Sequence, residues 1–192
     1  MIKPVLQDDA FLEDVSRAKS EPDKLHLWWL GQSGYLIQWQ NHHLLIDPYL
    51  SDSLTKKYAG TDKPHVRMTE RVIAPERLNF VNVVTSSHNH TDHLDGETLS
   101  PLMKANPKLT VLVSRANVPF AAERLQVSTE RLISIRVDDE VMRIDPFTFY
   151  ALPSAHKRLS RMRTMSTVVL ASLSNLVSGR SITAAIASPT MV

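Results

Sequence analysis

Residues 86–95 read Ser-Ser-His-Asn-His-Thr-Asp-His-Leu-Asp, and the rest of the chain is best interpreted outward from this stretch. It places His88, His90, Asp92 and His93 within six residues, directly after an apolar segment, 80–86, that predicts a buried strand. Imidazoles at alternate positions leaving a strand can converge on one cation, while Asp92 and His93 point to a second cation position. The alternative is a solvated, histidine-rich loop that chelates metal adventitiously, which the combination of residue type, spacing and strand context disfavours.

The composition narrows this metal chemistry. The 192 residues include no Cys, so thiolate sites, iron–sulfur clusters and Cys nucleophiles are excluded, and a metal must bind His, Asp, Glu or backbone oxygen. A content of 43% hydrophobic and 22% charged residues is typical of a soluble globular domain. The chain has no stretch of roughly 18 apolar residues and no signal-peptide pattern at its start, so we expect a cytoplasmic protein that does not enter a membrane.

The net charge of +2 averages two unlike parts. Residues 157–192 carry five basic and no acidic residues, whereas residues 1–156 hold 17 basic and 20 acidic residues, which gives −3. The basic tail has no aromatic residue to stack on bases, so the charge pattern does not favour a nucleic-acid partner. We expect a small-molecule substrate, and the sequence leaves the oligomeric state open.

Short apolar runs separated by turn residues predict a sheet that begins as an antiparallel meander, with strands at 24–30, 35–39 and 43–47. A polar stretch at 51–63 predicts a long surface loop, and residues 75–78 predict a helical turn. Further along, we expect helices at 97–105 and 117–125 and strands at 80–86, 109–114, 132–137, 141–144 and 147–152. Strands that alternate with short helices imply an α/β sandwich of sheets and covering helices.

Two residues at strand exits are candidates to complete the site. His156 follows the expected strand 147–152, and we expect it to supply a third imidazole from a different strand. Asp47 ends the strand 43–47 before Pro48, where it either hydrogen-bonds a ligating His from behind or serves only as a turn residue. The isolated histidines are interpreted as structural: His26, His42, His43 and His65.

The His motif, taken with Trp29-Leu30-Gly31-Gln32-Ser33-Gly34, Leu44-Leu45-Ile46-Asp47-Pro48-Tyr49 and Pro153-Ser154-Ala155-His156, resembles the metallo-β-lactamase-fold hydrolases. The branch that it resembles most contains the ascorbate-6-phosphate lactonase and similar Zn-dependent hydrolases, and the resemblance runs from about residue 24 to residue 156. It implies an αββα sandwich with the metal site at one edge, between the two sheets. Gln32 stands where related branches often have His, and Asn82 where Asp is common, so the substrate stays open.

By matching position, the resemblance implies that His88, His90 and His156 bind a first metal and that Asp92 and His93 bind a second. A metal-bridging hydroxide would then attack a lactone, ester, amide or phosphodiester, with Asp92 orienting it. Zn fits these ligands best, and Mn or Fe also suit imidazole and carboxylate. A nucleic-acid-processing member of the same superfamily is a further alternative that the charge pattern disfavours.

The tail departs from this family. Family members continue with a strand that ends in Ser-Gly-Asp, whose Asp bridges the metals, and with a later His, and neither is present after His156. Read one base out of frame, the codons from Leu173 onward can encode Phe-Glu-Leu-Gly-Gln-Trp-Thr-Ile-Tyr-His-Ser-Gly-Asp-Cys-Ile-Pro-Tyr-Asp-Gly, which contains that motif.

We therefore hypothesise a metallo-β-lactamase-like domain at 1–156, the N-terminal half of the sandwich, with the second half largely missing and an out-of-frame tail at 157–192. The alternative is a genuine tail that docks as a helix through Val168, Val169, Leu170, Leu173 and Leu176. If half of the sandwich is missing, the competing function is that of a catalytically inactive fragment that binds at most one metal.

Overall fold

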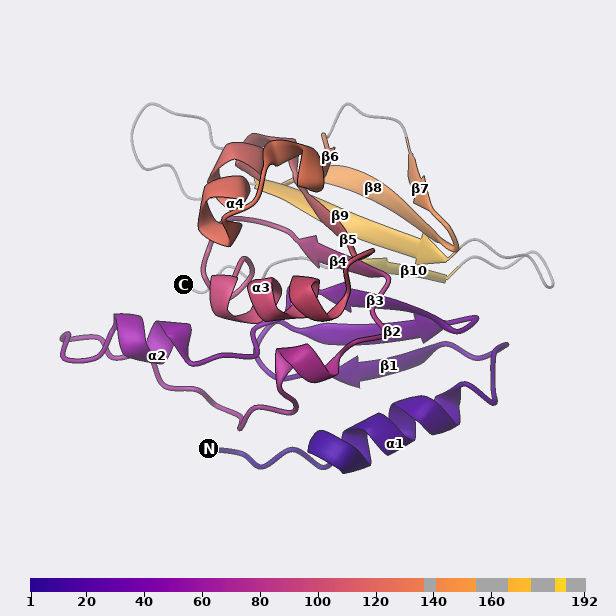
Figure 1. Cartoon of the computed structure of the whole chain (residues 1–192), viewed down its shortest axis with the longest axis horizontal. Coiled ribbons are helices and arrows are strands. Elements are labelled where there is room, and N and C mark those ends of the chain that lie inside the picture. The colour runs from indigo at the N-terminus through magenta and orange to yellow at the C-terminus, as the bar shows by residue number, and fades with distance from the viewer. Residues whose placement is uncertain (137–140, 155–165, 174–181, 186–192) are drawn as a thin grey trace. The chain divides into compact units, whose positions relative to one another are not determined.

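The computed structural model describes residues 1–136, 141–154, 166–173 and 182–185 of the chain (Figure 1). The chain divides into two compact units. The first consists of Met1–Val84 with His90–Thr110, and the second of Thr85–Asn89 with Val111–Val192. The expected α/β class is confirmed, because helices and strands alternate along the chain.

The first unit contains the predicted meander. Strands β1 (His26–Trp29), β2 (Tyr35–Trp39) and β3 (His42–Ile46) pair antiparallel in sequence order. In this register, Leu27 lies opposite Ile37, and Ile37 lies opposite Leu44. Apolar side chains at alternate positions therefore share one face of the sheet, as a period of two residues requires.

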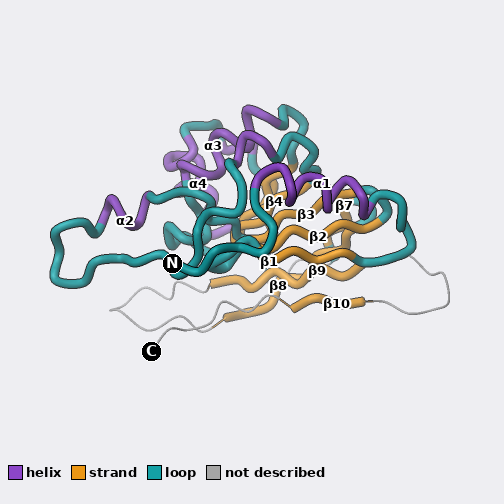
Figure 2. Tube along the Cα trace, turned by 90° about the horizontal axis from the view of Figure 1, so that it is seen from below, coloured by secondary structure: helices purple, strands orange, loops and turns teal. Residues whose placement is uncertain are grey.

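Helix α1 (Asp8–Ala18) packs on the other face of the meander and was not predicted from the sequence (Figure 2). Phe11 and Val15 of this helix are buried, and the Phe11 ring meets the Trp28 ring edge-on with the centroids 6.3 Å apart. Trp28 Nε1 donates a hydrogen bond of 2.9 Å to Asp14. The missed signal is the i, i+4, i+7 spacing of Phe11, Val15 and Ala18, preceded by acidic residues that suit a helix N-terminus.

The expected loop at 51–63 is partly wrong, because it contains the short helix α2 (Ser53–Lys57). Leu54 is buried and its backbone N–H donates to the hydroxyl of the buried Tyr49, at 2.9 Å. These two contacts anchor a segment whose polar composition predicts only a solvated loop. The predicted helical turn after it is confirmed as η1 (Pro75–Arg77).

Strand β4 (Val83–Ser86) is buried at every position and leads from the first unit into the second. Beyond the His motif, α3 (Gly96–Ala105) occupies the expected position with Pro101 inside it. It buries Thr98, Leu99 and Leu102.

The second unit contains β5 (Thr110–Ser114), η2 (Arg115–Asn117), α4 (Val118–Leu125), η3 (Thr129–Arg131) and β6 (Ile133–Ile135). Strands β5 and β6 pair in parallel, and α4 lies in the crossover between them. A separate antiparallel sheet follows, with the strands in the order β10-β9-β8-β7. Its members are β7 (Met142–Ile144), β8 (Phe147–Ser154), β9 (Ser166–Leu173) and β10 (Ile182–Ala185).

The tail corrects one expectation. The alternative of a docked helix is wrong for residues 168–173, because they lie in β9, which pairs along its whole length with β8. The β-branched Thr167, Val168 and Val169 favour a strand over a helix. Leu176 lies outside the described residues.

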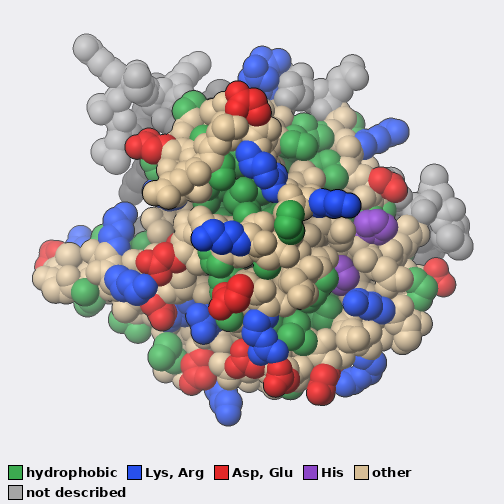
Figure 3. All heavy atoms as spheres, in the orientation of Figure 1, with side chains coloured by type: hydrophobic (Ala, Val, Ile, Leu, Met, Phe, Trp, Pro, Cys, Tyr) green, Lys and Arg blue, Asp and Glu red, His purple; other side chains and the backbone are tan. Residues whose placement is uncertain are grey.

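The surface in Figure 3 carries acidic and basic side chains interspersed over the face shown. Among the described residues, the helices are all too short or too polar to span a lipid bilayer.

Candidate metal centre

The His motif begins where β4 ends. His88 is buried, and its Nδ1 lies 3.0 Å from the hydroxyl of Ser87. The Ser86 hydroxyl donates to the His88 carbonyl at 3.1 Å. Two consecutive serines therefore fix both the ring and the backbone of His88 in the second unit, and they account for the Ser-Ser pair that opens the motif.

The motif continues in the first unit with a tight turn. The backbone N–H groups of His93 and Leu94 both donate to the His90 carbonyl, at 3.0 and 2.8 Å. This turn leaves the His90 side chain exposed, holds Asp92 half-buried and buries His93. One short peptide thus presents three potential ligands in three different environments.

His93 lies between two carboxylates. Its Nδ1 donates to Asp47 Oδ2 at 2.6 Å, and its Nε2 lies 3.4 Å from Asp92 Oδ2. Asp47 is 1% exposed and 46 positions away in sequence. Since Asp47 occupies Nδ1, the free electron pair available for a cation is that of Nε2, on the side of Asp92.

The Asp92–His93 spacing fits one shared cation. Two ligands at about 2.1 Å from a tetrahedral ion are separated by about 3.4 Å. The distance between His93 Nε2 and Asp92 Oδ2 matches this value. Imidazole and carboxylate are also ligands that Zn, Mn and Fe accept, so the residues present fit a divalent metal.

The electrostatics of the metal-free site favour a positive charge on it. Burial acts to lower the pKa of the His93 imidazole, but hydrogen bonds and charge from Asp47 and Asp92 outweigh burial and raise that pKa to about 9. Two carboxylates around one imidazole therefore stabilise a bound positive charge.

Asp47 reaches this position through an unusual backbone conformation. It directly follows β3 and has a φ of +40°, in the left-handed region, immediately before Pro48. Asp tolerates this region better than most residues, although such a conformation still costs of order 1–3 kcal/mol. Strain of this kind persists only where surrounding contacts hold it, and the bond to His93 is one such contact.

Asp95, at the end of the motif, has a structural part. Its carboxylate accepts hydrogen bonds from the hydroxyls of Ser51, Ser53 and Thr98, at 2.6, 2.8 and 2.5 Å. It also caps α3 by accepting from the Glu97 backbone N–H at 3.3 Å. Four donors occupy this buried carboxylate, so it fastens the start of α2 to the start of α3.

Of the residues expected to form the site, the structure brings Asp47, Asp92 and His93 together in the first unit. His88 is buried in the second unit, His90 is exposed, and His156 lies outside the described residues. Asp47, His88 and His93 are buried residues that each offer one ligand atom to a metal.

Ser33 is a residue of the site to which sequence reasoning gave no role. Its hydroxyl lies 3.2 Å from the carbonyl oxygen of Asp47 and 2.9 Å from that of Asp92. The sequence does offer a signal, because Ser33 is the hydroxyl residue in a Gly-x-Ser-Gly turn between two predicted strands.

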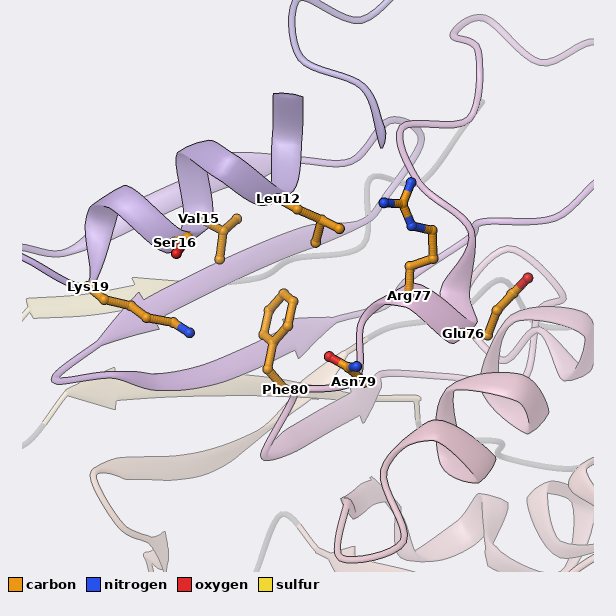
Figure 4. A pocket seen from close by; sticks show the side chains of 8 residues that line it. All are labelled: Leu12, Val15, Ser16, Lys19, Glu76, Arg77, Asn79 and Phe80. Atoms are coloured by element: carbon orange, nitrogen blue, oxygen red, sulfur yellow. The ribbon is translucent and has the colours of Figure 1, made fainter. Parts of the chain in front are cut away.

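A separate cavity of about 430 Å³ lies against α1 (Figure 4). Val15 lines it from the helix and Lys19 from the residue after the helix, and Asn79 and Phe80 line it from the segment after η1. It includes none of the motif residues. Phe80 also contacts His43, with the ring centroids 4.7 Å apart, and His43 Nε2 lies 3.0 Å from Gln38 Oε1.

Comparison with known proteins places these features in context. The sequence model of the β-lactamase superfamily domain matches residues 26–172. A UPF0173 metal-dependent hydrolase of Sulfurisphaera tokodaii is 27% identical over 115 residues, which cover 58% of this chain and 42% of that protein. Another, from Saccharolobus solfataricus, is 25% identical with the same coverage. This chain therefore spans less than half the length of these curated relatives.

A solved structure shows a similar fold. CmlA, a diiron β-hydroxylase from Streptomyces venezuelae, superimposes with a TM-score of 0.56 over 88% of this chain and 31% of that chain, at 22% identity. At this level of identity the likeness concerns the fold alone.

Proposed function

This chain belongs to the β-lactamase superfamily, and on that premise we propose that it is a metal-dependent hydrolase whose site is built around His93. The observation that carries the proposal is the position of this imidazole, with Asp47 behind Nδ1 and Asp92 beside Nε2. The metal-dependent hydrolases among its relatives support the same reaction class.

We assign Asp92 and His93 to one divalent cation, and His88 and His90, together with His156, to another. Zn is our first choice, with Mn or Fe as alternatives, because the donors are imidazoles and carboxylates. A divalent cation supplies Lewis acidity, which lowers the pKa of water and stabilises negative charge that develops on a substrate oxygen.

The residues of the chain have separate tasks in this proposal. Asp47 fixes the His93 tautomer and ring orientation, so that Nε2 stays directed toward Asp92. The half-buried Asp92 carboxylate orients the attacking water and accepts its proton. We propose a small-molecule substrate with a lactone, ester or phosphodiester bond, as in lactonase-like hydrolases, and a cytoplasmic location.

The test combines metal binding with turnover. Purified full chain is titrated with Zn²⁺, Mn²⁺ and Fe²⁺ and then assayed on a lactone, an aryl ester and a phosphodiester. Asp92→Asn should keep the cation assigned to His88, His90 and His156 but lower turnover by about 10²-fold or more. His88→Ala should lose most of the metal of its site. Asp62→Asn, at an exposed position, is the matched control for Asp92→Asn. An Asp92→Asn variant with parental turnover would refute the role of Asp92.

A second candidate is a non-catalytic chain that binds at most one cation. It follows from the expectation that residues 157–192 do not supply the Ser-Gly-Asp strand and the later His of the family. Metal stoichiometry distinguishes the two candidates, because the hydrolase should hold two ions per chain and the non-catalytic form one or none.

A further inference from the structure

The turn that joins β1 to β2 has a well-defined conformation. The Gly34 N–H donates to the Gly31 carbonyl at 3.1 Å, and the Leu30 N–H donates to the Gly34 carbonyl at 2.8 Å. Gly31 and Gln32 have φ values of +83° and +49°. Positive φ values at successive positions produce the tight reversal that connects the two strands, and they set the direction in which Ser33 leaves the turn.

Both glycines of this turn touch neighbouring segments. A Cβ atom on Gly31 would lie 2.3 Å from Thr69 Oγ1, and one on Gly34 would lie 3.4 Å from the Pro48 Cα. The turn is therefore seated between residue 69 and the chain that leaves β3. Since its backbone is confined on both sides, the position of the Ser33 hydroxyl is confined as well.

The Ser33 hydroxyl is shared by two carbonyl groups of the site. It lies 2.9 Å from Asp92 O and 3.2 Å from Asp47 O, so its single proton serves both acceptors. Neither carbonyl could bond to the other, because both are acceptors only. The hydroxyl thus joins the chain after β3 to the turn of the His motif through backbone carbonyls, in addition to the side-chain bond between Asp47 and His93.

We propose that Ser33 is a positioning residue that sets the spacing of Asp47 and Asp92 around His93 and thereby the affinity of this site for a divalent cation. The inference rests on the proposed function, in which Asp92 and His93 bind the cation. Asp47 is held at a φ of +40°, and Asp92 lies on a short turn, so loss of the shared donor removes one of the contacts that fix each backbone. A small shift of either carboxylate changes the ligand spacing that matches a bound metal.

The experiment compares Ser33→Ala, Ser33→Thr and the matched control Ser20→Ala in the full chain. Ser20 also donates its hydroxyl to a backbone carbonyl, that of Arg17 at 2.8 Å, but at the exposed end of α1. We expect Ser33→Ala to weaken Zn²⁺ binding by about tenfold or more, while Ser33→Thr and Ser20→Ala bind as the parent does. With Co²⁺ in place of Zn²⁺, the visible absorption bands should shift in Ser33→Ala alone, because they report ligand geometry. Should Ser33→Ala fail to fold, Ser33→Val, which has the shape of Thr without its hydroxyl donor, takes its place.

A second readout keeps this inference separate from the proposed function. In metal-free protein, amide hydrogen exchange of His93 and Leu94, which both donate to the His90 carbonyl, reports the order of the turn. Exchange should become about tenfold faster in Ser33→Ala and return to the parental rate in Ser33→Thr. If the parent chain binds no cation, the proposed function is overturned. The exchange rates of His93 and Leu94 still test whether Ser33 orders the turn. The positioning role of Ser33 is overturned if Ser33→Ala keeps the parental Zn²⁺ affinity or the parental exchange rate. It is also overturned if Ser33→Thr is as impaired as Ser33→Ala.

Discussion

The Nδ1 atom of His93 lies 2.6 Å from Oδ2 of Asp47, although the two residues are separated by 46 positions. Both side chains are buried, at 7% and 1% exposure, so water competes little for this bond. The pair determines which His93 nitrogen faces Asp92. In the proposed function, Asp47 acts on the bound cation through His93.

Asp47→Asn should therefore weaken cation binding while leaving the fold intact. The amide can still accept a hydrogen bond from Nδ1, but it lacks the charge that strengthens His93 as a ligand, so we expect a loss of about 10- to 100-fold in affinity. Isothermal titration with Zn²⁺ measures it. Asp52→Asn is the control, because the Asp52 side chain is 65% exposed. Equal affinities of the two variants would contradict this account.

His43 predicts a pH dependence of stability. Burial, with smaller contributions from the charges of Lys19 and His42, lowers its pKa from 6.5 to about 4. Between these values the unfolded chain binds a proton that the folded chain does not. The stabilisation is thus complete above about pH 6.5 and is lost as the pH falls through about 4, a change of about 3 kcal/mol.

Urea unfolding at intervals from pH 4 to pH 7 tests this prediction. His43→Gln retains a side chain that can hydrogen-bond to Gln38 but does not titrate, so its free energy of unfolding should fall less steeply with acid. Identical slopes for the variant and the parent would show that His43 does not cause the dependence.

Gly31 and Gly60 form a natural comparison. Both have positive φ, at +83° and +76°, but a Cβ at Gly31 would meet Thr69 Oγ1, whereas a Cβ at Gly60 would meet no atom within 4 Å. Gly60→Ala should cost only the conformational strain, about 1 kcal/mol, and Gly31→Ala about 1–3 kcal/mol more. Thermal and urea unfolding of the two variants measure the difference. Equal losses of unfolding free energy would mean that the Thr69 side chain moves aside without cost, contrary to this prediction.

Asp95→Asn should destabilise the protein through lost hydrogen bonds. An amide has one acceptor oxygen in place of two, so it cannot serve the hydroxyls of Ser51, Ser53 and Thr98 together. We expect a loss of about 2–3 kcal/mol in urea unfolding. Glu97→Gln, which breaks an exposed pair with Lys56, should have a much smaller effect. An equally small loss of unfolding free energy for Asp95→Asn would show that its hydrogen bonds to Ser51, Ser53 and Thr98 do not stabilise the protein.

The out-of-frame origin of residues 157–192 stays a prediction. Sequencing of the coding DNA from His156 past Val192, with the intact mass of the native protein, tests it. A one-base slip that restores Ser-Gly-Asp is the expected result, and an unchanged frame with the mass of this sequence would rule it out.

The sequence predicted the strands up to β8 well, because period-two apolar runs interrupted by turn residues dominate that part of the chain, but it predicted neither β9 nor β10. Tyr35–Trp39 is the clearest case, as its expected and observed bounds coincide. The resemblance to metallo-β-lactamase-fold hydrolases is confirmed by the family match over residues 26–172. The helix α1 escaped prediction because its polar positions mask the spacing of Phe11 and Val15, and α2 because a long-range contact to Tyr49 holds it.

The candidate site was predictable only in its residue types. The His motif indicates metal chemistry, but the burial of His93 against the exposure of His90 depends on how the turn at 90–94 folds. The role of Ser33 depends on backbone carbonyls, which no sequence pattern displays. Contacts of this kind are set by tertiary structure and are therefore invisible to periodicity and spacing.

The hydroxyl of Ser33 joins segments that are 14 and 59 positions distant from it. A site assembled over such separations forms late in folding, since each loop must close before its contacts exist. Because only chains that have completed folding carry the assembled site, the number of cations bound per chain reports the yield of folding as well as the affinity of the site. In a preparation that binds less than one cation per chain tightly, the titration endpoint would give the fraction of correctly assembled molecules.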